Sequence, residues 1–173
     1  MRKCPIYPGE ARTRMAGLDE IAKAIAKAQI AVKELDYEAE EISGKEFRDY
    51  MVGGTVSGDK YTLRDVLSNP YLMAHEVVEV SELKRSGVRI DSRTVRRLGL
   101  ARQMYEAHLK AAEYELELAL RDKETSWIRS RLRDMQVWLK DEHLPKQLVP
   151  RCRDLVDRLA TSIPSAKGDV SEP

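Results

Sequence analysis

The chain has little cysteine, glycine, proline or charge of one sign, and each shortage excludes a class of protein. Its 173 residues include 2 Cys, 9 Gly and 7 Pro, which excludes disulfide scaffolds, collagen-like chains and low-complexity sequences. The 30 Lys and Arg residues face 29 Asp and Glu residues, so a net charge of +1 excludes a broadly polycationic nucleic-acid binder. A chain of this length is long enough to bury a core as one domain.

Long hydrophobic runs and amide side chains are also missing. No uninterrupted apolar stretch approaches the roughly 18 residues of a membrane span, and the basic residues 1–8 lack the apolar segment of a secretory signal. We therefore expect no membrane partner and a cytoplasmic location. Asn69 is the sole asparagine, and 34% of the residues are charged. A low amide content with many charged residues is typical of hyperthermophile proteins. We interpret the source as a thermophilic, prokaryotic or archaeal cell, in which a Cys4–Cys152 disulfide is an alternative to a buried Cys152 thiol.

The clearest positive signal is a heptad pattern from Leu18 to Ile42. Apolar residues recur there at alternating intervals of three and four, which keeps one seam of a helix facing a partner helix. The seam consists of Leu18, Ile21, Ile25, Ala28, Val32, Leu35, Ala39 and Ile42. Large aromatic residues that could fill a core are few, at 6%. We therefore interpret the Leu18–Ile42 helix as a coiled-coil contact through which the chain forms a homodimer.

Capping signals and apolar periodicity predict the remaining helices. Thr62-x-x-Asp65 has the form of a capping box, opening a helix over 63–85. Pro70 should kink or break this helix near Asn69. A second capping box, Ser43-x-x-Glu46, should open a short turn, and further helices are expected over about 93–122, around Ile128–Leu139, and from Pro150.

These elements predict an all-α fold. We expect one helical bundle over residues 1–164, built from three long helices and two or three shorter ones in up-down packing. Residues 165–173 are polar and are expected to form a flexible tail.

One helical face combines an imidazole with carboxylates. His75, Glu79 and Glu82 are spaced i, i+4 and i+7, so they stack on a helix, with Glu76 beside them. This donor set makes His75, Glu76, Glu79 and Glu82 a candidate site for a divalent metal, of which Mg²⁺ is one option. The alternative, which we favour from the sequence, is a solvated polar face with an ordinary His75–Glu79 surface pair and no cofactor.

Pairs of carboxylates three residues apart resemble those of the all-α nucleoside-triphosphate pyrophosphatases. The resemblance implies a magnesium-dependent enzyme, although the order and separation of the pairs differ from the family's pattern. The chain departs from the pattern of di-iron carboxylate bundles, because none of its histidines has Glu three positions before it, which argues against a ferritin-like oxidase. The pairs are Glu38-x-x-Glu41, Glu46-x-x-Asp49 and Glu76-x-x-Glu79, with Glu113 and Glu117 as further ligands if they face inward.

The segment 83–98 resembles a helix-turn-helix. It is most similar to the version in ferric-uptake-type winged-helix repressors, in which Gly-x-x-Ile leads into Thr-Val-x-Arg. The resemblance implies DNA binding. The arginines that would contact phosphates and base edges are Arg89, Arg93, Arg96 and Arg97. The alternative is a capped helix start whose arginines pair with acidic neighbours.

Three functions therefore follow from the sequence. We favour a non-enzymatic interaction or scaffolding module, with the magnesium-dependent enzyme and the DNA-binding protein as alternatives. His108 lies beside an apolar seam and is interpreted as a hydrogen-bonded residue at the edge of the core, while His143 is expected to be exposed. Trp127 and Trp138 are three helical turns apart and are expected to pack in the core.

Overall fold

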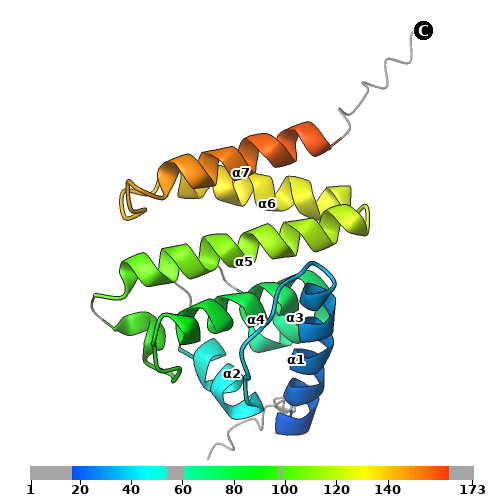
Figure 1. The fold of residues 1–173 in the computed structure, drawn as a ribbon, viewed down its shortest axis with the longest axis vertical. Coiled ribbons are helices and arrows are strands. Elements are labelled where there is room, and N and C mark those ends of the chain that lie inside the picture. The colour runs from blue at the N-terminus through cyan, green and yellow to red at the C-terminus, as the bar shows by residue number, and fades with distance from the viewer. Residues whose placement is uncertain (1–16, 54–60, 98, 164–173) are drawn as a thin grey trace, which may run out of the picture.

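The computed structural model describes residues 17–53, 61–97 and 99–163, and these ranges contain helices and no strand (Figure 1). The predicted all-α class is confirmed, and none of the described helices is long and apolar enough to cross a bilayer. The elements are α1 (Leu18–Lys33), α2 (Gly44–Met51), α3 (Leu63–Ser68), α4 (Pro70–Arg85), a 3-10 turn (Thr94–Arg96), α5 (Ala101–Arg121), α6 (Thr125–Trp138) and α7 (Val149–Ser162).

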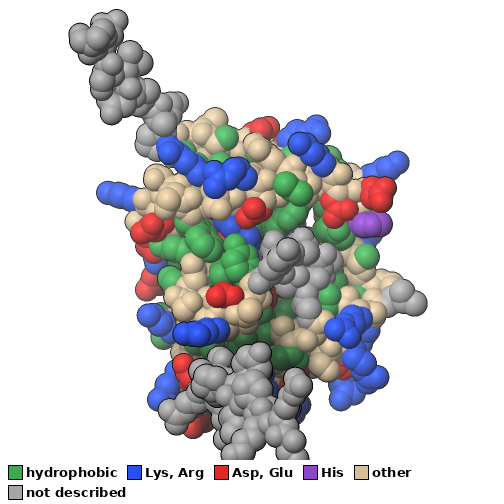
Figure 2. Space-filling view, turned by 180° about the vertical axis from the view of Figure 1, so that it is seen from behind, with side chains coloured by type: hydrophobic (Ala, Val, Ile, Leu, Met, Phe, Trp, Pro, Cys, Tyr) green, Lys and Arg blue, Asp and Glu red, His purple; other side chains and the backbone are tan. Residues whose placement is uncertain are grey.

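The centre of the fold is the α4–α5 pair, which forms the most extensive helix contact among the described elements. In Figure 1, α1, α2 and α3 lie on one side of this pair, and α6 and α7 lie on the other. Apolar side chains fill both sides of the pair, so α4 and α5 are covered around most of their circumference. Figure 2 shows basic and acidic side chains scattered together over one face of the molecule.

The first helix is shorter than predicted, because α1 ends at Lys33 rather than at Ile42. Asp36 adopts a left-handed conformation with φ of 59°. The Tyr37 amide donates to the Val32 carbonyl over 3.1 Å, and the Asp36 amide donates to the Lys33 carbonyl over 3.0 Å. These two bonds form a Schellman motif, which satisfies the last carbonyls of α1 and turns the chain away from the helix axis.

The α1 seam faces α4 of the same chain. Ile21, Ile25 and Ala28 are buried in one core cluster with Val77, and Val32 is buried in another with α4 residues. The heptad prediction is therefore correct from Ile21 to Val32, whereas Leu18 is 42% exposed and the helix does not continue beyond α1. Because α4 of the same chain covers this seam, the seam no longer supports a dimer contact. Homodimerisation through the helix stays a prediction.

The predicted break at Asn69 is confirmed. Asn69 has an extended backbone, with φ of −123° and ψ of 117°, as expected for a residue that precedes proline. Its side chain accepts hydrogen bonds from the amides of Tyr71 (2.9 Å) and Leu72 (3.1 Å), which caps α4. The capping boxes at Ser43 and Thr62 also form as predicted.

The long helix expected from Arg93 begins later, at Ala101. Residues Thr94–Arg96 form a single 3-10 turn, and Gly99 has a left-handed φ of 90° that an α-helix does not allow. Over the described part of the 83–98 segment, the second α-helix of a helix-turn-helix therefore does not form.

The two C-terminal helices, α6 and α7, lie where the sequence predicts them. Cys152 is a buried thiol on α7, which is one of the two alternatives predicted for this residue. Cys4 and the predicted tail 165–173 lie outside the described residues.

Candidate metal centre

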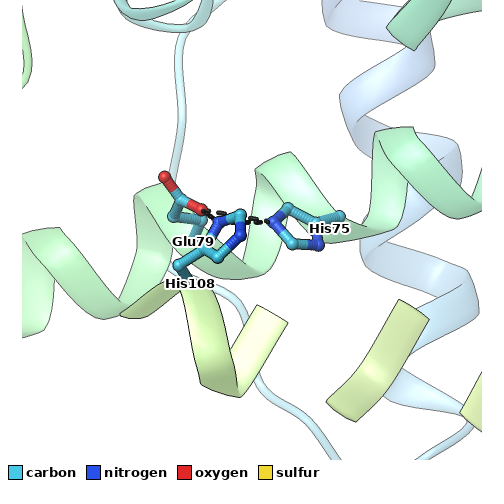
Figure 3. A group of neighbouring side chains, drawn as sticks. All are labelled: His75, Glu79 and His108. Atoms are coloured by element: carbon cyan, nitrogen blue, oxygen red, sulfur yellow. Dashed lines mark hydrogen bonds and ion pairs between the residues drawn. The ribbon is translucent and has the colours of Figure 1, made fainter. Parts of the chain in front are cut away.

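A buried group of ionisable side chains lies between α4 and α5. His75 and Glu79 are one turn apart on α4, and His108 faces them from α5 (Figure 3). Their exposed fractions are 2%, 5% and 8%. The expectation that His75 and Glu79 form a solvated pair is therefore wrong. Buried residues such as Val77 and Val78 occupy most of the circumference of α4, and a helix of that kind is buried between neighbours.

Three atoms of this group converge. His75 Nε2 lies 3.2 Å from Glu79 Oε2 and 3.0 Å from His108 Nδ1, and His108 Nδ1 lies 2.6 Å from Glu79 Oε2. Among the described residues, this is the one group of three or more His, Cys, Asp or Glu side chains whose ligand atoms meet in this way. We refer to these three atoms as the triad.

With Glu79 ionised, as its lowered pKa indicates, no arrangement of protons on the two imidazoles makes all three contacts of the triad favourable. Each imidazole nitrogen carries at most one hydrogen. With hydrogens on both nitrogens, two N–H groups oppose each other across the 3.0 Å contact between His75 and His108. With a hydrogen on one nitrogen alone, the other nitrogen presents a lone pair to the Glu79 carboxylate. A cation held by all three atoms removes this conflict, because each atom then directs a lone pair at it.

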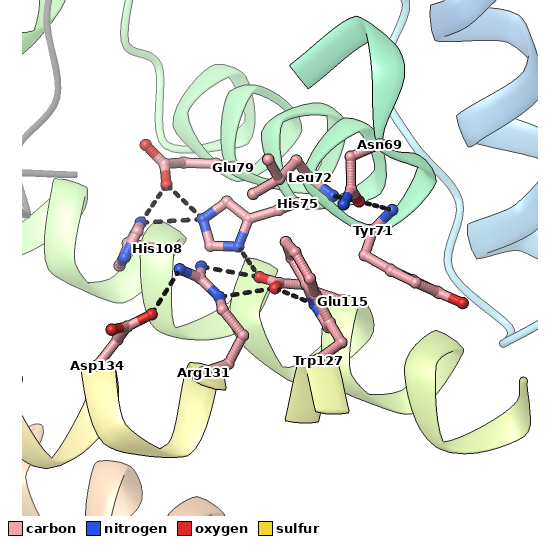
Figure 4. A network of polar contacts seen from close by, with 10 residues as sticks. All are labelled: Asn69, Tyr71, Leu72, His75, Glu79, His108, Glu115, Trp127, Arg131 and Asp134. Carbon is pink, nitrogen blue, oxygen red and sulfur yellow. Dashed lines mark hydrogen bonds and ion pairs between the residues drawn. The ribbon is translucent and has the colours of Figure 1, made fainter. Parts of the chain in front are cut away.

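A second layer of side chains fixes the orientation of His75 (Figure 4). The Nδ1 atom of His75 lies 2.7 Å from Glu115 Oε2, so an Nδ1–H donated to that carboxylate leaves Nε2 for the triad. Glu115 is fully buried and accepts further bonds from Trp127 Nε1 (2.8 Å) and from two nitrogens of Arg131 (2.7 and 2.9 Å). Carboxylates that orient a histidine in this manner are typical of metal sites.

Glu79 is oriented in the same way from α2. The Tyr50 hydroxyl donates to Glu79 Oε1, so Oε2 is the oxygen that faces the two imidazoles. Burial raises the pKa of Tyr50 well above its ordinary value, and the Glu79 charge raises it further, so the phenol keeps its proton. One oxygen of Glu79 is thereby reserved for the triad.

The metal-free centre holds charges of both signs. Burial opposes the charged form of His75, but hydrogen bonds to Glu115 and Glu79 outweigh it and raise the pKa to about 10. Burial likewise opposes ionisation of Glu115, yet the Arg131 charge and the His75 bond lower its pKa to about 2. The pKa of Glu79 is lowered too, because the two imidazoles outweigh its burial. His108 Nε2 is buried with no hydrogen-bond partner among the described residues.

The other predicted metal ligands lie outside the triad. Glu82 accepts from the Tyr37 hydroxyl (2.7 Å) and from Arg85 (2.7 Å), and Glu76 is half-buried. The remaining carboxylates of the pyrophosphatase-like pattern do not join the group either, and Glu113 and Glu117 do not face inward as ligands. Their observed pairs are Glu38 with Lys33, Glu46 with Lys84, Asp49 with Lys45, Glu113 with Arg151 and Glu117 with Arg158.

The candidate DNA-contacting arginines lie on the turn that follows α4. Arg89, Arg93 and Arg96 are exposed, while Arg97 bonds to the Arg89 carbonyl (2.6 Å) and to Asp91. Because no second helix forms there, these side chains do not share the face of a recognition helix.

Sequence reasoning missed the roles of His108, Glu115, Arg131 and Tyr50. A signal for the first two exists, because His108, Ala111, Glu115 and Leu118 follow a 3-4-3 spacing and form a second buried stripe on α5. His143, in contrast, is exposed as expected, and Trp138 packs in the core with its ring 4.4 Å from that of His108.

Comparisons with protein-family models, curated proteins and solved structures gave no match for this chain. The functional argument therefore rests on the geometry of the site.

Proposed function

We propose that this protein binds one divalent first-row transition-metal ion between α4 and α5. The ligand atoms are His75 Nε2, Glu79 Oε2 and His108 Nδ1. The observation that carries the proposal is the convergence of these three atoms within 3.2 Å of one another, in an arrangement that protons on the two imidazoles do not satisfy while Glu79 is ionised.

The dimensions of the triad suit such an ion. A point about 2.1 Å from all three atoms, the usual length of bonds from zinc to nitrogen and oxygen, lies about 1 Å out of their plane. The hydrogen bond from His75 Nδ1 to Glu115 supports the proposal independently, because it selects the tautomer that a ligand at Nε2 requires.

The donor set favours zinc, iron, cobalt or manganese over magnesium. Two of the three donors are imidazole nitrogens, which suit first-row transition metals, whereas Mg²⁺ prefers oxygen ligands and retains water. We therefore propose a transition-metal centre in place of the magnesium site that the Glu-x-x-Glu pattern predicted. The interaction module and the DNA-binding protein remain predictions.

The test is metal binding by the full chain after treatment with a chelator. Titration calorimetry should show one equivalent of Zn²⁺ or Co²⁺ bound, with Mg²⁺ silent. The midpoint temperature of thermal unfolding should rise when the ion is added, because an ion at one hundred times its Kd stabilises a fold by about 2.7 kcal/mol.

Glu79→Gln and its surface counterpart Glu82→Gln form a matched pair on α4. The first substitution removes a ligand charge and should weaken Co²⁺ binding by at least about tenfold, the loss typical of damage to a metal site. The second should bind Co²⁺ as the unchanged protein does. Absence of saturable binding by any of these ions, or equal affinity of the two variants, would contradict the proposal.

A further inference from the structure

The described residues supply only three ligand atoms to the proposed ion. Glu79 can contribute one oxygen, because its Oε1 accepts the Tyr50 hydroxyl. Glu115 also bonds to a triad residue, but its two oxygens already accept from His75, Trp127 and Arg131. Structural zinc sites have four protein ligands, whereas reactive sites have three and leave a position for water or substrate.

The shape of the triad places the remaining coordination positions together. The three contacts of 2.6, 3.0 and 3.2 Å form one small triangle, and an ion bonded to all three atoms must stand to one side of it. All positions that the triad leaves unfilled are therefore on the other side of the ion, directed away from the three protein atoms.

Charge then selects the kind of ligand. A divalent ion with the Glu79 carboxylate and two neutral imidazoles has a net charge of +1. The buried Glu115–Arg131 pair around it contributes no net charge. Two further carboxylates lie nearby, because Asp134 is 3.5 Å from Arg131 and the charge of Glu76 acts on Tyr50. The Asp134 side chain is 39% exposed and Glu76 is half-buried, so solvent screens both. An uncompensated charge in a buried site is costly, and an anion bound to the ion removes that cost.

We infer that the metal ion has at least one coordination position that accepts a small monoanionic ligand, such as hydroxide or a carboxylate. This inference rests on the proposed function and deepens it, since it places the centre among reactive rather than structural metal sites. Tyr50 acts as a positioning residue, because its hydrogen bond to Oε1 keeps Glu79 a one-oxygen ligand and so leaves a coordination position of the ion for the anion.

The test uses the full chain loaded with Co²⁺, whose visible absorption reports its coordination. Sodium azide, a small monoanion, should change the Co²⁺ spectrum in a saturable way. A chain that takes up no Co²⁺ would contradict the proposed function itself. A chain that binds Co²⁺ but shows no response to azide would contradict this inference alone.

Tyr50→Phe tests the positioning role, with Tyr71→Phe as its control. Without the Tyr50 hydroxyl, Glu79 can bind the ion through both oxygens and compete with the anion. We expect Co²⁺ to bind still, with azide affinity several-fold lower. Tyr71 donates to Asp122 at the surface, and its substitution should leave the azide titration unchanged. Equal azide affinity in both variants would overturn the role assigned to Tyr50.

Discussion

Replacement of Arg131 by Met tests whether the metal-free centre depends on its buried ion pair. The Arg131 guanidinium bonds to both oxygens of Glu115, over 2.7 and 2.9 Å. The two side chains are 3% and 0% exposed, so water is excluded from both charges. Methionine keeps much of the length and apolar surface of the arginine stem but removes its charge. Arg131→Met therefore removes the principal counterion of the buried Glu115 carboxylate and leaves His75 as its remaining charged partner.

The expected loss of stability follows from these contacts. Hydrogen bonds to charged groups contribute about 1.5–3 kcal/mol each, and removal of one partner of a buried ion pair costs about 3–5 kcal/mol. We expect Arg131→Met to lower the free energy of unfolding by about 3–5 kcal/mol. That is a large part of the roughly 5–15 kcal/mol that stabilises an ordinary domain.

A double-mutant cycle measured by urea unfolding in the presence of a chelator isolates the pair. Glu115→Gln should also be strongly destabilising, because it leaves the Arg131 cation buried. The variant with both substitutions should lose less than the sum of the single losses, with a coupling energy of about 2–3 kcal/mol. Arg133→Met, at an exposed position of the same helix, should change stability by less than about 0.5 kcal/mol.

The reasoning is refuted by either of two results. A loss below about 1 kcal/mol for Arg131→Met would place it in the range of exposed ion pairs, whose energies are small because water screens them. Additive losses in the cycle would show that Arg131 and Glu115 do not stabilise each other.

Two further predictions concern pH and helix packing. In the metal-free protein, the raised pKa of His75 contributes stability that is fully present below pH 6.5 and is lost as the pH rises to about 10. The lowered pKa of Glu115 contributes stability that is fully present above pH 4.5 and is lost as the pH falls to about 2. Urea midpoints should therefore be highest between these windows, and His75→Gln should flatten the alkaline decline; an unchanged decline would contradict the first assignment. A Cβ at Gly44 would lie 2.8 Å from the Leu18 carbonyl oxygen, so Gly44→Ala should separate α1 from α2 and cost about 1–3 kcal/mol in urea unfolding. The exposed neighbour Lys45→Ala serves as control, and equal stability of the two would contradict the close packing.

Local features of the fold could be predicted from the sequence because their causes are local. The capping boxes at Ser43 and Thr62 and the break before Pro70 depend on residues within a few positions of each other, and all three form as predicted. The all-α class also followed from the apolar periodicity. The end of α1 was predicted wrongly because the heptad pattern continues past Asp36 without a break, although the chain turns there. Tyr37 stabilises this turn by a hydrogen bond to Glu82 on α4, a contact between distant residues that the local pattern does not reveal.

The site illustrates the limit of the same reasoning. The sequence determined that His75 and Glu79 share one face of a helix, since this requires only the helical repeat. Whether that face meets water or protein depends on α5, which brings His108 and Glu115 from more than thirty residues away. Only the tertiary structure decided this, because the spacing on one helix carries no information about what covers it. Burial is what turns an ordinary polar pair into a candidate metal centre.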